Sequence, residues 1–526
     1  MLQETPAVDI LFWGGIVRFA QAATAAAPTL LVGLIVAGVM RRLIGPEMTF
    51  KAFGGDTWRS LPQAWLWGML LPVCSLGVIP IAYELRRARL SGGAILAFAL
   101  TAPLFNPLSL LYGLTLSSPS VIVAFALGSL LVVTTVGFVW DRLFPGTALG
   151  GEVPPPNPPG IKRVGAVFVT AARHLVGPTL GYCAIGLAGT TVLSTVFPSG
   201  SLQDSMAHDD PTAPLLALGI AIPAYATPLT IMQQVGSMFV HGNSVGAAFV
   251  LLSLGAGANL GLLAWASRTY GLRRAAAFLG VFVTVVLAIA YSVEKPLYTA
   301  GNVESAHTHT FDGYSNPFAW KSFSGSTRLP SLALRKIVEE TEVFEWFGVG
   351  AVGMLLATGL VLRSVDPAGR VDAYLAAPPP ESDRVGALNR EVPAPVLGGI
   401  AILGLVAISL AGCYVYYPPP EETLADLRNT RAEALSYAAG GDAATSIKFL
   451  ERYDELTRKL QVGYYLRYGP LDEFQQLRAK SLRGWLERLK DQLQAGQFDR
   501  VRETSNRIFD AHRRCSQAFS TTAAAG

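Results

Sequence analysis

Long apolar stretches separated by short polar corners dominate the chain up to about residue 417. A helix needs about 20 apolar residues to cross a bilayer. A shorter stretch, 9–20, holds aromatic residues and Arg18, and is expected to lie along the membrane interface. Ten stretches are long enough to be membrane segments: about 21–40, 61–84, 93–116, 119–140, 165–197, 213–239, 244–266, 273–292, 343–363 and 396–417. The pattern predicts an all-α polytopic membrane protein.

Helix-breaking residues interrupt two of these segments. The first, 61–84, contains Pro72, Gly77 and Pro80, and the second, 213–239, contains Pro223. A broken helix is tolerated at membrane depth only where its backbone lines a cavity or is buried in protein. Each broken segment is therefore predicted to form half of a transport site.

The two broken segments and the segments after them share an order of features. When Pro72 is matched to Pro223, Cys74 falls on Tyr225. Thirteen positions separate Gly93 from Asn106, and thirteen separate Gly246 from Asn259. This order favours an internal repeat, although two Gly- and Ala-rich membrane segments could also share it by chance.

The distribution of basic residues indicates how the segments cross the membrane. If both broken segments dip in and return as re-entrant hairpins, the corner Arg86–Arg89 lies inside, and the loop 198–212, which has no Lys or Arg, lies outside. This arrangement obeys the positive-inside rule, whereas full crossing would place Arg86–Arg89 outside. Each half then has three crossings plus one re-entrant hairpin. An odd number of crossings inverts the second half relative to the first, as in many secondary transporters.

The domain organisation follows from these segments. A polar, proline-rich stretch separates the two membrane repeats, and the character of the chain changes after Pro418–Pro420. The expected domains are a first membrane repeat (1–150), a linker (151–164), a second membrane repeat (165–292), an extracytoplasmic loop (293–340), two further transmembrane helices with their connecting loop (341–420), and a soluble helical bundle (421–526).

The last hundred residues are charged and show helical periodicity. Apolar positions such as Ile447, Leu450 and Tyr453 recur at three- and four-residue spacing, which is typical of helices packed in a small bundle. Four helices are predicted, about 422–439, 443–462, 470–494 and 498–516. No nucleophile and base constellation is visible, so protein interaction or self-association is the expected role. The count of crossings places this domain outside.

Composition supports a membrane protein and excludes several function classes. Only 15% of the 526 residues are charged and the mean hydropathy is +0.39, against about 25% charged residues in soluble domains. The net charge of +4 gives no reason to expect nucleic acid as a partner. The four cysteines have no disulfide or zinc spacing. The absence of a phosphate-binding loop leaves an ion gradient or a partner as the energy source.

Polar residues near the helix breakers are the candidate pathway. Cys74 and Ser75 are predicted to contact the solute, although a free cysteine also behaves as a small buried hydrophobe. Asn106 and Asn259 either face the pathway or brace the broken backbone. Tyr225, Thr227, Gln233 and Gln234 could line the opposite side, or the two glutamines could form a hairpin tip at the interface. Pro72, Gly77, Pro80 and Pro223 shape the breaks.

The polar loop after the eighth segment holds a candidate metal site. His307, His309 and Asp312 lie close together, with Glu304 nearby. Imidazole and carboxylate groups at this spacing could bind zinc, copper or nickel. A solvated loop without metal is the alternative. No resident cofactor is expected elsewhere.

The first broken segment resembles a known family. Leu71–Pro80 reads LPVCSLGVIP, and Gly93–Pro107 reads GAILAFALTAPLFNP. These motifs resemble the predicted-permease family that includes the organoarsenical efflux permeases (YraQ/ArsP-like), over roughly residues 20–290. The resemblance implies an inner-membrane permease that exports a small toxic or metal-like solute. The family pattern has a second cysteine where this chain has Leu76, so the resemblance does not imply arsenical specificity, because soft metalloids prefer clustered sulfur ligands.

Together these patterns predict a multi-pass permease of the plasma membrane. It is expected to perform secondary transport, with efflux as the direction, of a small solute or metal-like species at a midplane site between two re-entrant hairpins. The expected partners are the lipid bilayer and the solute, with self-association or a protein partner through 421–516. The alternative is a non-transporting scaffold or metal sensor that acts through the 293–340 loop and the C-terminal domain. No catalytic constellation indicates an enzyme.

Overall fold

The computed structural model describes residues 8–55, 57–105, 107–116, 119–145, 162–202, 206–208, 210–298, 310–318, 328–376 and 393–520. Within these ranges the regular structure is helical, and the only strand-like feature is an isolated antiparallel bridge between Ala207 and Asn243. The predicted all-α class is confirmed. The helices form two compact units: one runs up to Ser109 and from Val123 to Ala407, and the other comprises Leu110–Ile122 and the chain from Ile408 onward.

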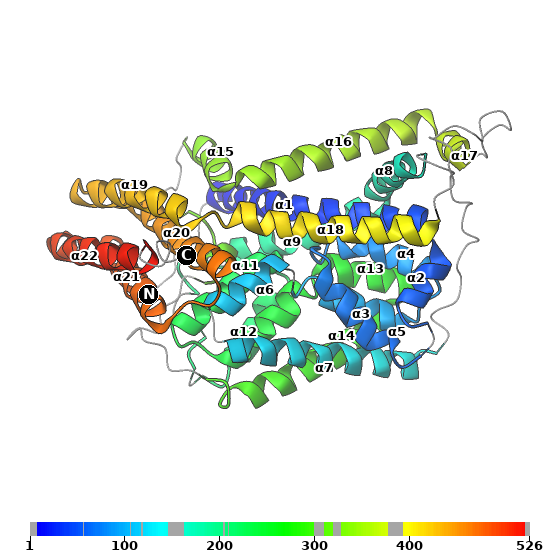
Figure 1. Ribbon diagram of the computed structural model, residues 1–526, viewed down its shortest axis with the longest axis horizontal. Helices are drawn as coiled ribbons and strands as arrows, with labels where there is room; N and C mark the ends of the chain where they lie inside the picture. Colours follow the sequence, from blue (N-terminus) through cyan, green and yellow to red (C-terminus); the bar gives the residue numbers. More distant parts are fainter. Residues whose placement is uncertain are drawn as a thin grey trace. The chain divides into compact units, whose positions relative to one another are not determined.

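The first half of the membrane part begins with a long helix, α1 (Val8–Val39), which ends in a π-helical turn, Met40–Ile44 (Figure 1). The stretch 9–20, expected to lie separately at the interface, is the first part of this helix, because no breaker separates it from the apolar run that follows. The remaining helices are α2 (Pro46–Ala52), α3 (Ser60–Leu70), α4 (Val78–Arg87), α5 (Gly92–Thr101), α6 (Pro107–Leu116) and α7 (Pro119–Leu143).

The second half begins with α8 (Lys162–His174), a π-helical turn at Leu175–Thr179, and α9 (Leu180–Val196). It continues with α10 (Ala213–Ala221), α11 (Pro228–Val240), α12 (Val245–Val250) with a π-helical extension at Leu251–Ala256, α13 (Leu260–Tyr270) and α14 (Leu272–Val293). A short 3-10 turn, Asp312–Tyr314, and α15 (Leu329–Glu340), α16 (Val343–Val365), α17 (Arg370–Ala376) and α18 (Ala394–Tyr416) follow.

Five described helices are long and apolar enough to span a membrane: α1 with its π-helical turn, α7, α8–α9, α14 and α16. The bent pair Val245–Ala256 and Leu260–Tyr270 makes a sixth if it is one span, with a bend of 57°. The chain is a multi-pass membrane protein.

Each half contains two interrupted segments, one more than the sequence predicted. The segments 93–116 and 244–266 were expected to be continuous helices. The first breaks after Thr101, because Pro103 and Pro107 cannot continue the helix. The second breaks before Asn259, whose side chain caps the next helix by accepting a hydrogen bond from the Leu262 amide (2.8 Å).

The two halves repeat the same polar anchor 153 positions apart. Ser91 caps α5 and donates to Asp141 (2.8 Å), which also accepts from the Gly93 amide (2.8 Å). Ser244 caps α12 and donates to Glu294 (2.7 Å), which also accepts from the Gly246 amide (2.6 Å). A buried helix N-terminus needs hydrogen-bond partners for its backbone amides. Both halves supply these partners with the same kinds of residue at one fixed offset, which is strong support for the internal repeat.

The hairpin corners repeat at the same offset. Arg89 and Gly242 both have a left-handed backbone, with φ of 63° and 64°. The residue after each donates its amide to a carbonyl five residues back, Leu90 to Leu85 (3.3 Å) and Asn243 to Met238 (2.9 Å). A non-glycine residue such as Arg89 rarely adopts such a φ. The two corners therefore share a backbone conformation although their residue types differ.

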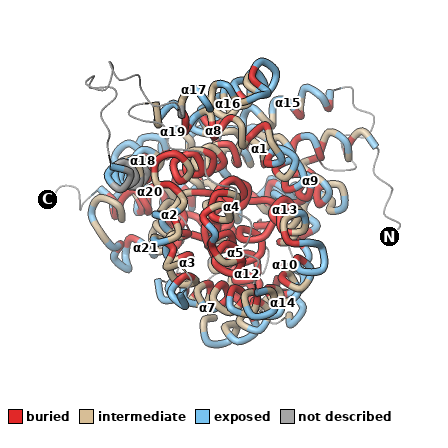
Figure 2. The backbone as a smooth tube through the Cα atoms, turned by 90° about the vertical axis from the view of Figure 1, so that its right-hand side faces the viewer, coloured by how far each residue is buried: buried red, intermediate tan, exposed pale blue. Residues whose placement is uncertain are grey.

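The centre of the membrane unit is made by the hairpins. All ten residues of α5 and all six of α12 are buried. Figure 2 shows α5 and α12 drawn almost wholly as buried, and α4 drawn mostly so. Small residues recur in α5 and α12, which lets backbones approach closely in the absence of a hydrophobic driving force. The hairpins are therefore covered by protein rather than facing lipid.

The C-terminal unit contains the four helices expected from periodicity: α19 (Pro420–Ala439), α20 (Ala443–Tyr468), α21 (Glu473–Gln494) and α22 (Val501–Ser520), the last preceded by a 3-10 turn, Phe498–Arg500. Asp442 and Asp472 cap α20 and α21 by accepting from the Thr445 and Gln475 amides. Leucines and alanines at three- and four-residue spacing, with Tyr453 and Phe519, form one buried core. The predicted bundle helices are confirmed.

Two titratable side chains of the C-terminal unit, His512 and Asp454, have pKa values well below their ordinary ones. The Tyr453 hydroxyl lies 2.6 Å from Nδ1 of His512. Burial and nearby Arg431 lower the pKa of His512 to about 4. Asp454 accepts from Arg458 (2.7 Å) and Arg483 (2.8 Å), and these two guanidinium groups hold the pKa of Asp454 well below its usual range.

The domain should lose stability as the pH falls from about 6.5 towards 4. The unfolded chain binds a proton at His512 in this window and the folded chain does not, so acid favours unfolding. Hydrogen exchange of the α20 and α22 amides in the full-length protein measures the effect. His512→Gln, which keeps an amide beside Tyr453, should flatten the pH dependence. An unchanged slope in this variant would contradict the assignment.

Candidate functional site

Cys74, Ser75 and Gly77 lie in the first break, between α3 and α4. The side chains of Cys74 and Ser75 are fully buried. The Gly77 amide donates to the sulfur of Cys74 (3.4 Å), and the Val78 amide donates to the Cys74 carbonyl (3.0 Å). The thiol thus sits at the N-terminal end of α4, where freed backbone groups are available to a bound solute.

The second half supplies Tyr225 and Thr227 from the break between α10 and α11. The Tyr225 amide donates to the Thr190 hydroxyl on α9 (2.7 Å). Thr227 caps α11 by accepting from the Thr230 amide (3.1 Å). The Tyr225 hydroxyl is buried and makes no hydrogen bond of normal geometry to a described residue. Its electrostatic neighbours are Cys74, Cys183 and Thr29.

Two contacts join the first break to the second half. Asn259 is fully buried and donates from Nδ2 to the Ser75 hydroxyl (2.6 Å) while it caps α13. These two bonds fit the second of the two roles expected from the sequence, in which Asn259 braces the broken backbone. Cys183 on α9 is buried, and Cys74 is among its electrostatic neighbours. Cys183 is far from Cys74 in the sequence, and it was not among the predicted site residues.

Glycines let two long helices reach the broken backbones. A Cβ on Gly33 of α1 would collide with the Gly77 carbonyl, and a Cβ on Gly189 of α9 would collide with the Pro223 carbonyl. Gly186, one turn earlier on α9, faces Leu76 and Asn259. The helices α1 and α9 thus hold the first and second breaks in the same way, which brings Cys183 to the site.

The remaining predicted residues are placed around this centre. Pro80 is buried in α4, and Pro72, Pro223 and Gln233 are partly buried. Asn106, His307 and His309 lie outside the described residues. Asp312 is described, and its backbone carbonyl accepts from Arg18 (2.6 Å). The pathway and metal assignments of all these residues stay predictions.

A segment that follows the two repeats, Thr310–Phe318, packs on the second hairpin through polar contacts. Gln234 on α11 is buried, donates to the Thr310 carbonyl (3.1 Å) and accepts from the Tyr314 hydroxyl (2.9 Å). The segment Thr310–Phe318 is itself anchored, because Asn316 donates its amide to the Phe197 carbonyl (2.9 Å). Gln234 therefore holds an overlying segment, and its place in the pathway or at the interface stays a prediction.

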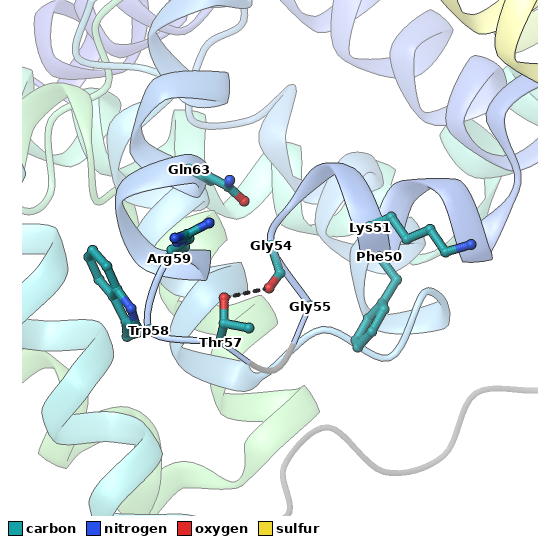
Figure 3. A pocket seen from close by; sticks show the side chains of 8 residues that line it. All are labelled: Phe50, Lys51, Gly54, Gly55, Thr57, Trp58, Arg59 and Gln63. Atoms are coloured by element: carbon teal, nitrogen blue, oxygen red, sulfur yellow. Dashed lines mark hydrogen bonds between the residues drawn. The ribbon is translucent and has the colours of Figure 1, made fainter.

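A separate hollow lies between α2 and α3 (Figure 3). It is lined by Phe50, Lys51, Gly54, Gly55, Thr57, Trp58, Arg59 and Gln63, and Thr57 donates across it to the Gly54 carbonyl (2.7 Å). None of the four breaks contributes to its wall, so it is a surface feature distinct from the candidate site.

Comparison with known proteins agrees with this architecture. A family model described as a predicted permease, ArsP_1, matches residues 13–295, which is more than half of the chain. The chain belongs to this predicted-permease family. The match runs from within α1 to just past α14 and contains both hairpins.

A curated relative supports the same conclusion over a shorter stretch. The UPF0718 protein YcgR of Bacillus subtilis (strain 168) is 33% identical over 85 residues. The matched stretch is 16% of this permease and 29% of that protein, so the permease spans less than a third of its relative's length. No solved structure matches the chain significantly.

Gly189→Ala should destabilise the membrane unit. The added methyl group meets the Pro223 carbonyl, and overpacking of this kind costs about 1–3 kcal/mol. Gly181→Ala on the same helix is the matched control, because nothing lies within 4 Å of a Cβ there. Thermal unfolding of the purified protein in detergent should show a lower midpoint for Gly189→Ala only. Equal midpoints would contradict the close contact.

Proposed function

We propose that this permease is a secondary transporter of the inner (plasma) membrane that exports a small, sulfur-seeking solute. The solute binds in the buried space between the first break, the second break and α9. Two thiols, Cys74 and Cys183, and the phenol of Tyr225 supply the contacts. Soft metal and metalloid species prefer such sulfur ligands.

The observation that carries this proposal is the approach of Cys183 to Cys74. The first motif has Leu76 where the family pattern has a second cysteine, and a single thiol holds a soft metalloid poorly. In the proposed site, Cys183 of α9 supplies the second thiol. Gly186 and Gly189 support this assignment, because they let that helix lie against the breaks.

The repeat supports alternating access as the transport mechanism. The site uses one hairpin from each half, and the two halves share anchors and corners at a fixed offset. Inverted repeats of this kind rock around a midplane site between discontinuous helices. Cys74, Ser75 and Asn259 are fully buried, which fits a state closed to both sides. A gradient supplies the energy, since no nucleotide-binding loop is present in the sequence.

Cys74→Ser and Cys183→Ser should each lower transport by about tenfold or more, a loss of at least about 1.4 kcal/mol of solute stabilisation. The probe is phenylarsine oxide, whose arsenic forms As–S bonds to two thiols while its oxygen and the two thiol protons leave as water. Flux is measured in inside-out proteoliposomes containing the full-length protein.

Cys515→Ser is the control for this experiment, because Cys515 is equally buried but lies in the C-terminal core. It should transport like the wild type. Wild-type flux in both site variants, with all proteins correctly inserted, would remove the thiol site. If the wild-type protein itself shows no flux of phenylarsine oxide, the proposal that it exports sulfur-seeking solutes is wrong.

A further inference from the structure

The segment Thr310–Phe318, which we call the strap, is mostly buried although little of it is regular structure. Phe311 and Asn316 are fully buried, and Tyr314 is 2% exposed. The strap lies beyond residue 295, where the match to the permease family ends. Irregular backbone that is buried in a membrane protein needs hydrogen-bond partners from the protein itself. The surrounding helices supply these partners to the strap.

The strap is bonded to the first long helix of one half and to the end of α9 in the other. Arg18 of α1 donates to the Ser315 carbonyl (3.0 Å) and to the Asp312 carbonyl (2.6 Å). The Asn316 amide donates to the carbonyl of Phe197, the residue just after α9 (2.9 Å). Because all three bonds use backbone atoms of the strap, its course across α1 and α9 is fixed.

The bonds between the strap and the second hairpin pass through a single side chain. Gln234 of α11 donates to the Thr310 carbonyl (3.1 Å) and accepts from the Tyr314 hydroxyl (2.9 Å). If α11 moves away from the strap, both of these bonds break, whereas the bonds of the strap to α1 and α9 can persist. Gln234 is therefore the point at which the hairpin and the strap can separate.

The three helices that hold the strap also form the proposed transport site. Helix α1 contacts the first break through Gly33, and α9 contacts the second break through Gly189. Helix α11 begins at the second break, where Thr227 caps it. Gln234 lies two helical turns after Thr227, about 10 Å along the helix axis. The strap thus lies on the same helices as the site, displaced from the breaks along α11.

The strap meets α1 and α9 at one shared end. A Cβ on Gly15 of α1 would lie 3.0 Å from Cγ2 of Thr191 on α9, so the N-terminal part of α1 lies beside the C-terminal part of α9. Arg18 and Phe197, which hold the strap, belong to these two parts. The strap therefore joins α1, α9 and α11 at the end of the membrane unit towards which α11 runs from the second break.

We propose that the strap is a gate that closes the transport site towards this end, and that it opens when Gln234 separates from Thr310 and Tyr314. This inference rests on the proposed transport function and adds a gate to its site. When the second hairpin moves, the strap stays with α1 and α9, and the path along α11 from the second break opens. The distribution of basic residues predicts that this end faces outside. The gate would then control release of the exported solute.

The rate at which Cys74 reacts with a thiol reagent measures opening of the gate without any solute. A membrane-impermeant maleimide is applied to the full-length protein in sealed vesicles of each orientation, and labelled cysteines are identified by mass spectrometry. Gln234→Met removes both bonds and should speed labelling of Cys74 roughly tenfold. Tyr314→Phe removes one bond and should give a smaller increase. Both increases should occur only from the face that carries the strap, which Ser201→Cys marks by its own reaction, because Ser201 lies on an exposed turn just beyond α9.

Tyr291→Phe is the matched control for Tyr314→Phe. It also removes one tyrosine hydroxyl, which donates to the Pro211 carbonyl (2.7 Å), but it acts between α14 and the turn before α10. This variant should label at the wild-type rate. Wild-type labelling of Cys74 in both strap variants, or an equal increase from both faces, would overturn the gate. If Gln234→Met does not insert, Tyr314→Phe decides, because it leaves the aromatic ring in place.

Flux of phenylarsine oxide, measured in the same vesicles, separates this inference from the proposed function. No flux in the wild type, together with one-sided labelling of Cys74 in Gln234→Met, would leave the gate in place and overturn the proposed class of solute. Wild-type flux together with labelling that does not respond to either strap variant would overturn the gate and leave the transport proposal intact.

Discussion

The need to satisfy broken backbone inside the membrane determines most of this structure. Each interruption leaves helix ends whose amides and carbonyls find no partner in lipid. Asn259, Thr227 and the serine–carboxylate anchors meet these needs with side chains from the protein itself. Each of these caps and anchors acts within its own half of the repeat. Asn259 also donates to Ser75 of the first break, so one capping residue joins the two halves.

Close helix contact is the second consequence. The helices α1 and α9 can press on the broken segments only where a glycine faces a carbonyl, as Gly33 faces Gly77 and Gly189 faces Pro223. Such contacts fix the rotation of α9 about its own axis. With this rotation Cys183 is buried, and Cys74 is among its electrostatic neighbours. The position of Cys183 thus depends on the glycines of α9. The residues next to Cys183 in the sequence do not indicate this position.

The sequence predicted the features that depend on local patterns. Helix breakers at Pro72 and Pro223, the matched spacing of Gly and Asn, and the four C-terminal helices all follow from residues close together in the chain. The extra breaks after Thr101 and before Asn259 were missed. A capping residue such as Asn259 inside an apolar run resembles an ordinary buried polar side chain. Long-range pairs such as Ser75 with Asn259 depend on packing that no local pattern encodes.

The two hairpins are held by different elements packed against them. The first is tied to α8 through Glu84 and His174, and the second is tied to Thr310 and Tyr314 through the amide of Gln234. A carboxylate–imidazole contact occurs in both halves, because Nδ1 of His208 lies 2.9 Å from Oε1 of Glu294, the anchor of the second hairpin. The two halves are therefore alike at their buried helix N-termini and differ in the segments that cover the hairpins.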